Sequence, residues 1–117
     1  MLQLSPAVRY YLYRSPADMR KGFDSLSGIV TSQMQGQVLN GSVFIFLNRN
    51  RTHIKLLHWE GDGFALYYKR LERGTYELPF AEVSGASMPV TYQQLQCMLQ
   101  GINLRKIEYR KRYQQTT

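Results

Sequence analysis

The sequence contains little of what several common kinds of functional site require. Its single cysteine, Cys97, excludes a disulfide within the chain and suits a reducing compartment. One cysteine and two histidines cannot complete a structural zinc site without carboxylates. His53 and His58 are separated by an odd number of residues, so in a strand they point to opposite faces. We therefore expect no bound metal and no cofactor.

Long apolar runs and carboxylates are also scarce. The sequence has no run of about 18 apolar residues that predicts a membrane span, and its first residues lack the pattern of a signal peptide, so we expect a cytoplasmic chain. Several of the 8 acidic residues, among them Asp18, Glu60 and Asp62, suit turns or helix starts. Too few carboxylates are then left for two-metal catalysis. We expect no catalytic residues and no enzymatic activity.

Positive charge, in contrast, is in excess. The chain has 15 lysines and arginines against 8 acidic residues, for a formal net charge of +7. A domain this basic is suited to a polyanion, of which nucleic acid is the commonest in a cytoplasm. The alternative is a small basic protein whose charge serves only solubility.

Residues 43–79 predict an antiparallel β-meander. Four apolar runs, VFIFLN, HIKLLHW, FALYYKRL and TYELP, are separated by short polar turns, and Pro79 ends the last one. Connections this short force neighbouring strands to run antiparallel. A further aromatic strand is predicted from Arg9 to Arg14, and residues 80–89 are expected to form a linker.

One helix is predicted before this meander in the sequence, and another is predicted after it. The first is expected to begin at Ser15, with Asp18 three residues later, and to run to about Met34. Thr91 and Gln94 form a second capping box, which opens a helix over residues 92–102. The expected fold is therefore α+β, with an antiparallel β-meander of about four to five strands packed with two α-helices. We expect residues 1–104 to form a single domain and residues 105–117 to be a basic, flexible tail.

Basic and aromatic residues alternate along the predicted strands and turns. Lysine and arginine neutralise phosphates, and exposed rings can stack on unpaired bases. No helix-turn-helix is legible, so base-specific recognition is not predicted. The candidate DNA-binding residues are Arg49, Arg51, Lys55, Lys69, Arg70, Arg73, Tyr67 and Tyr68, with Arg105, Lys106, Arg110, Lys111 and Arg112 in the tail.

A second interpretation is that Trp59 and the tyrosines anchor a partner protein. A third is that they are simply buried against the sheet. Both faces of the meander contain large residues, so the periodicity does not choose between these interpretations.

Three segments of the chain resemble a known bacterial family. They are MRKGFDSLSGIV (Met19 to Val30), the whole of Val43 to Pro79, and LQCMLQGINL (Leu95 to Leu104). Together they resemble the Orf2-like accessory protein, called TnpB, of the IS66 group of insertion sequences, which is distinct from the RNA-guided nuclease of the same name. The basic run after Leu104 matches no motif of the family.

The resemblance implies an accessory role in DNA transposition. Such elements encode a separate, larger transposase that carries the acidic catalytic triad. The expected partners are therefore DNA, that transposase and the element's other accessory protein.

Overall fold

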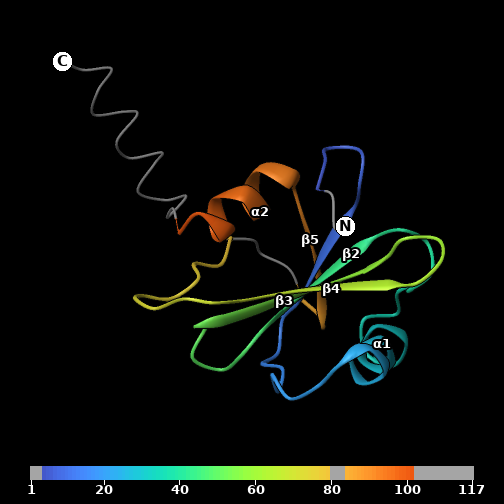
Figure 1. Cartoon of the computed structure of the whole chain (residues 1–117), viewed down its shortest axis with the longest axis horizontal. Coiled ribbons are helices and arrows are strands. Elements are labelled where there is room, and N and C mark those ends of the chain that lie inside the picture. Colours follow the sequence, from blue (N-terminus) through green and yellow to red (C-terminus); the bar gives the residue numbers. More distant parts are fainter. Residues whose placement is uncertain (1–3, 80–83, 102–117) are drawn as a thin grey trace.

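The computed structural model describes residues 4–79 and 84–101, which form five strands and two helices (Figure 1). The strands belong to one sheet in the order β4-β3-β2-β1-β5. This confirms the predicted α+β architecture. The elements are β1 (Tyr10–Tyr13), α1 (Phe23–Ser32), β2 (Val43–Leu47), β3 (His53–Trp59), β4 (Phe64–Arg70), β5 (Ser87–Val90) and α2 (Tyr92–Leu99).

The predicted meander is present as β2, β3 and β4. Each strand pairs antiparallel with the next, with Ile45 opposite Leu56 and Leu57 opposite Leu66. The turns between them have too few residues for a parallel crossover. The predicted antiparallel meander is therefore confirmed for three of its four strands.

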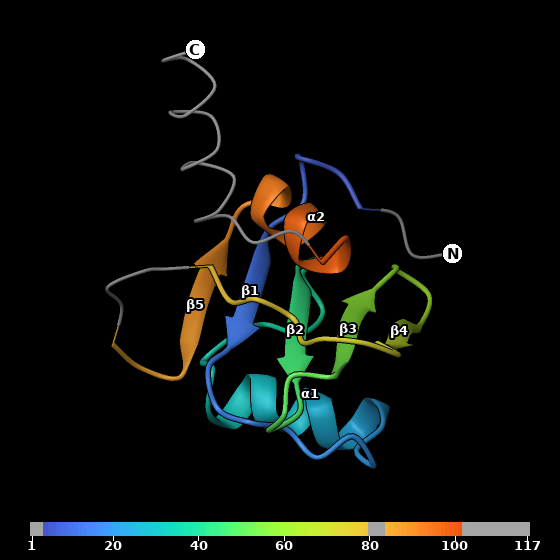
Figure 2. The ribbon, with the colours of Figure 1, turned by 90° about the vertical axis from the view of Figure 1, so that its left-hand side faces the viewer.

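The prediction of a fourth strand in the meander is wrong. The chain turns at Gly74, which has a positive φ of 73°, and Thr75–Pro79 crosses one face of the sheet as irregular chain (Figure 2). Tyr76 is fully buried there, and its backbone N–H donates to Arg51 O at 2.7 Å. Burial of this ring on the sheet face replaces pairing along the free edge of β4. The remaining strand, β5, comes from the segment that was expected to be a linker.

The aromatic strand predicted from Arg9 to Arg14, for which the sequence indicated no partner, is present as β1. β1 runs parallel to β2, with Tyr10 opposite Val43 and Leu12 opposite Ile45, and it pairs antiparallel with β5 on its other side. A parallel pair needs a long crossover connection. Residues 14–42, which include α1, supply that connection.

Helix α1 begins later than predicted. Residues 15–22 are not helical, and Gly22 occupies the cap position without a side-chain hydrogen bond. The Asp18 carboxylate accepts from the backbone and guanidinium of Arg20 instead of capping a helix. Ala17 N–H donates to Leu47 O at 2.8 Å, so this segment is held against the end of β2.

Helix α2 begins as predicted. The Gln94 backbone N–H donates to Thr91 Oγ1 at 3.0 Å, and the Thr91 N–H donates to Gln94 Oε1 at 2.9 Å. The predicted capping box is therefore confirmed. The possible extension of this helix to Ile102 lies outside the described residues.

The two helices cover opposite faces of the sheet (Figures 1 and 2). Residues alternate between the faces along each strand. On the α2 face, Ile45, Leu56 and Tyr76 pack with Leu95 and Met98. The α1 face buries Leu26, Val30, Phe44, Phe46 and Leu57.

This arrangement explains the apolar run of β2. Every residue from Val43 to Leu47 is buried, as expected of a central strand that is covered on both faces. None of the described helices is long and apolar enough to cross a membrane.

Candidate nucleic-acid interface

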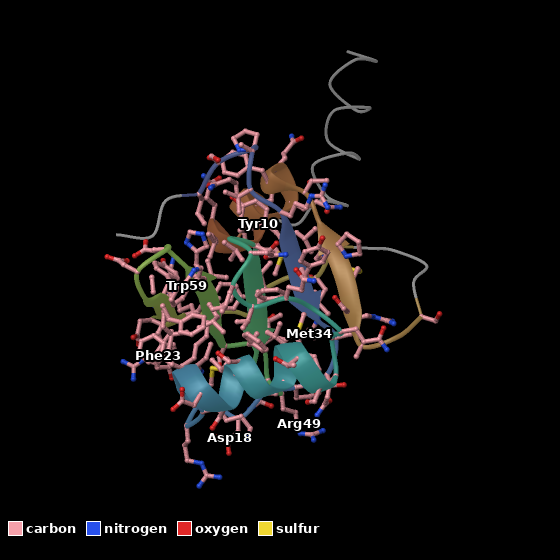
Figure 3. All side chains as sticks on the ribbon, turned by 90° about the vertical axis from the view of Figure 1, so that its right-hand side faces the viewer. Tyr10, Asp18, Phe23, Met34, Arg49 and Trp59 are labelled. Carbon is pink, nitrogen blue, oxygen red and sulfur yellow. The ribbon has the colours of Figure 1, made fainter. Side chains whose placement is uncertain are left out.

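The sheet topology brings most of the predicted basic residues to one end of the molecule. β2 and β4 end where β3 begins, because His53 pairs with Arg70 at the last position of the β3–β4 ladder. Figure 3 labels Arg49 at this end and Tyr10, near the start of β1, toward the opposite end. The predicted basic residues at this end are Arg49, Arg51, Lys69, Arg70 and Arg73.

The turn between β2 and β3 is held by the side chain of Asn48. Its Oδ1 accepts from the backbone N–H of Thr52 at 2.9 Å and of His53 at 3.0 Å, and its Nδ2 donates to Thr52 Oγ1 at 3.0 Å. Arg51 has a left-handed backbone conformation (φ 57°) and donates its N–H to Asn48 O. Arg49 and Arg51 are exposed, and neither guanidinium group is paired with any described residue. The turn therefore presents two uncompensated guanidinium groups on a fixed backbone.

A cavity of about 290 Å³ lies beside this turn. Because β1 and β2 are parallel, their carboxyl ends meet here, and Arg14 at the end of β1 joins Arg49 and Arg51 in its lining. None of its described lining residues is a carboxylate. Among the residues that the structure describes, the lining consists of Leu12, Tyr13, Arg14, Ser15, Pro16, Leu47, Asn48, Arg49, Arg51, Leu78, Pro79 and Met88.

Arg14 is a site residue that the sequence did not reveal. Its Nη1 donates to Gly85 O at 2.8 Å, which orients the guanidinium and leaves its charge without a described acidic partner. In the sequence, Arg14 only marks the end of an aromatic strand. The parallel pairing of β1 with β2, which the sequence did not indicate, is what places it at the cavity.

Tyr76 fixes the segment that forms another wall of the cavity. Its ring is buried, and its hydroxyl donates to Lys69 O at 3.3 Å. Burial, followed by the charge of a neighbouring Tyr67, raises the pKa of Tyr76 to about 12. The anchored ring holds Leu78 and Pro79, two and three residues later, beside the arginines.

Lys55 does not belong to the basic surface. Its side chain is buried, and its ammonium group donates to Met19 O at 2.7 Å and Lys21 O at 2.8 Å. The same group lies 4.6 Å from the ring centre of Tyr68. Lys55 thus fastens the chain before α1 to the sheet, and we remove it from the candidate interface.

The predicted residues of β4 are divided between the two faces of the sheet. Tyr67 and Lys69 lie on the α2 face, where Lys69 Nζ donates to Leu99 O at 3.1 Å. Tyr68 and Arg70 lie on the α1 face, where Arg70 forms an exposed ion pair with Glu72 at 2.9 Å. Tyr67 and Tyr68 are both exposed, but they cannot stack on the same base.

Trp59 belongs to an aromatic corner at the other end of the β3–β4 hairpin, formed by Phe23, Trp59 and Phe64. The Trp59 and Phe64 ring centres are 5.0 Å apart with an edge-on geometry, and those of Phe23 and Phe64 are 6.4 Å apart. Phe23 is 45% exposed and Trp59 is half-buried. At about 3.3 Å per strand residue, this corner lies roughly 20 Å from the arginine turn.

The described residues contain no group of three histidine, cysteine or carboxylate side chains that could hold a metal ion. His53 is part of the turn instead, with its Nδ1 2.8 Å from Thr52 Oγ1. The predicted tail residues Arg105, Lys106, Arg110, Lys111 and Arg112 lie outside the described residues.

Comparison with known proteins identifies the family. The family model described as "IS66 Orf2 like protein" matches residues 8–109, which extends five residues beyond the resemblance noted at Leu104. The chain is 34% identical over 105 residues to the uncharacterized protein y4hO of Sinorhizobium fredii (strain NBRC 101917 / NGR234), covering 90% of each chain. It is 23% identical over 108 residues to y4jC, another uncharacterized protein of the same strain, covering 92% of this chain and 91% of the other. No solved structure matches it significantly. The chain belongs to the IS66 Orf2-like family, whose members are accessory proteins of insertion sequences.

Proposed function

We propose that this protein is a non-catalytic accessory factor of transposition that binds DNA at the basic end of its sheet. The observation that carries the proposal is the grouping of Arg14, Arg49 and Arg51 around a cavity whose described lining residues include no carboxylate. Arg73, exposed in the loop after β4, extends the positive charge at the same end.

The chemistry of these groups favours phosphate. A guanidinium presents a rigid fork of donors that suits phosphate oxygens, and it stays charged at any physiological pH. Arg49 and Arg51 have no described partner to give up on binding, and their turn is already fixed by Asn48. These contacts would hold the DNA backbone without reading its sequence.

The non-catalytic part of the proposal rests on how the carboxylates are used. Asp18 pairs with Arg20 at 2.7 Å and Glu72 with Arg70 at 2.9 Å, and Asp24 lies in the first turn of α1. With magnesium or manganese, the purified protein should neither nick nor join DNA. Cleavage that disappears in Asp24→Asn or Asp62→Asn would overturn this part.

The salt dependence of DNA binding tests the main claim. For duplex DNA, the logarithm of the affinity falls with the logarithm of the salt concentration, with a slope of about −0.9 per phosphate neutralised. Replacing Arg49 and Arg73 by Ala and Arg51 by Gly should reduce the slope by up to about 2.7. Glycine is chosen for Arg51 because it accepts the left-handed backbone without strain.

Two controls separate the sheet end from the rest of the chain. Arg9→Ala removes one exposed charge at the opposite end of β1 and should leave most of the slope unchanged. Deletion of residues 105–117 measures what the basic tail contributes. If only the deletion changes the slope, the sheet end is not the DNA surface.

A second candidate function is docking on the transposase through the aromatic corner. The exposed ring of Phe23 beside Phe64 and Trp59 favours it, because exposed aromatic groups are common interface anchors. Phe23→Ser should abolish capture of the transposase and leave the DNA salt slope unchanged. Trp59→Ala is a weaker test, since truncating a half-buried ring can cost a few kcal/mol of stability and must be checked for folding.

A further inference from the structure

The arginine cavity differs from a flat phosphate-binding surface in having an apolar floor. Leu12, Leu47 and Met88 line it and are each at most 5% exposed, whereas Arg14, Arg49 and Arg51 are exposed at its rim. A ligand that fills it must therefore combine an anionic group with an apolar part. Inorganic phosphate would satisfy the rim and leave the floor empty.

The size of the cavity limits what can enter. Its volume of about 290 Å³ lies near the lower end of small-molecule sites, which span roughly 300–1,000 Å³. A base pair inside a duplex cannot enter such a space, because its apolar faces are covered by stacking. One unpaired nucleotide meets both requirements, since its phosphate is anionic and its base has two apolar faces.

We propose that the cavity holds one unpaired nucleotide of a DNA strand. Its phosphate lies against Arg14, Arg49 and Arg51, and its base enters between Leu78 and the apolar floor. This inference rests on the proposed DNA-binding function and adds a preference for a frayed, overhanging or single-stranded segment. Strand ends and junctions are where DNA offers such a nucleotide.

The fold pre-arranges the parts of this cavity. Asn48 closes the turn that carries Arg49 and Arg51, and the bond from Arg14 to Gly85 O orients the third guanidinium. The Tyr76 N–H to Arg51 O bond ties the wall that includes Leu78 to the same turn. Little ordering is then left to occur on binding, which favours affinity.

The test uses the full chain and three DNA probes of one sequence. They are a blunt duplex, the same duplex with a short single-stranded overhang, and that overhang with abasic sites in place of its bases. We expect the protein to bind the overhang about tenfold more tightly than the abasic overhang or the blunt duplex. Burying roughly 60 Å² of apolar surface produces a change in affinity of this size. Equal affinity for the normal and abasic overhangs would overturn the proposal, because the base would then make no contact.

Protein variants locate the preference. Arg14→Ala and Arg51→Gly should each remove most of the overhang preference, whereas Arg9→Ala should keep it. Leu78→Asp places a carboxylate at the rim from an exposed position, so it should abolish the preference without unfolding the chain. If all of these variants keep the wild-type preference, the cavity is not the nucleotide site.

The outcomes separate this inference from the proposed function. Binding to all three probes with equal affinity and a steep salt slope that depends on Arg49 and Arg73 would refute the nucleotide site alone. If replacing the arginines at the sheet end leaves the salt slope of DNA binding unchanged, both the nucleotide site and the proposed DNA-binding function are refuted. Tighter binding of the matching single-stranded RNA than of DNA would show that the ligand is RNA, and would overturn the assignment to DNA.

Discussion

Lys55→Met provides a sharp test of the distinction between structural and surface cations in this protein. Lys55 Nζ donates two hydrogen bonds, at 2.7 and 2.8 Å, to the carbonyl oxygens of Met19 and Lys21. Methionine keeps most of the apolar stem and removes both bonds. The effect of the substitution therefore reports the loss of the ammonium group with little change in packing.

The expected loss follows from these contacts. Hydrogen bonds that involve a charged group contribute about 1.5–3 kcal/mol each. Lys21 is exposed, so water can replace part of what its carbonyl loses. We expect Lys55→Met to lower the free energy of unfolding by about 2–4 kcal/mol in total. This is a large part of the about 5–15 kcal/mol that is typical of a domain.

Urea denaturation measures this loss directly. With a slope of roughly 1–3 kcal/mol per molar urea, the midpoint should fall by about 1–2 M while the slope stays the same. Lys69→Met is the matched control, because the half-buried Lys69 donates one longer bond of 3.1 Å to Leu99 O. Water reaches the ammonium group of Lys69, so Lys69→Met should lower the free energy of unfolding by less than the range for a charged hydrogen bond, about 1 kcal/mol or less.

The contradicting result is equally definite. In that result, Lys55→Met changes the free energy of unfolding by less than about 0.5 kcal/mol, which is the range of ordinary surface substitutions. It would also reduce the salt slope of DNA binding as much as Arg49→Ala does. Lys55 would then be a phosphate ligand, as the sequence alone suggested.

Three further predictions concern stability and titration. Burial raises the pKa of Tyr76 in the folded protein to about 12, above its ordinary value of 10.0. The stabilising effect of the neutral ring should therefore be full below pH 10 and fall as the pH rises toward 12. Tyr76→Phe should flatten this fall in urea unfolding curves. The Arg20 side chain lowers the pKa of Asp18 to about 2, so its stabilising effect should be present above about pH 4 and lost as the pH falls through 2. In an NMR titration, Arg20→Ala should return the midpoint of Asp18 toward 3.8, and an unchanged midpoint would contradict the pairing. Thr91→Ala, which removes the cap of α2, should lower the melting temperature by an amount equivalent to about 1 kcal/mol, with no change in DNA binding.

Short-range signals in the sequence predicted much of the fold. The antiparallel hairpins follow from the short turns between β2, β3 and β4, and the start of α2 follows from Thr91 and Gln94. Both are decided by neighbouring residues. The start of α1 was placed too early because Ser15 and Asp18 also suit a turn, and the contact from Ala17 to β2 favours an extended chain there.

Long-range pairings could not be read in the same way. Nothing in the sequence near Arg9 to Arg14 indicates that this strand lies parallel to β2, and Arg14 was missed as a site residue for that reason. The alternation in β3 placed Lys55 on a face, but only the tertiary structure shows that the face is covered by the chain before α1. The sequence therefore indicated which cations belong to the meander, but not which of them are free.

Amide chemical-shift mapping during addition of a short DNA duplex tests the central claim most directly, because it reports the contact surface without any mutation. We expect the largest changes at Arg14, at residues 48–52 and at residues 71–74, all at the basic end of the sheet. Changes concentrated around Trp59 and Phe64, or confined to residues 102–117, would contradict it.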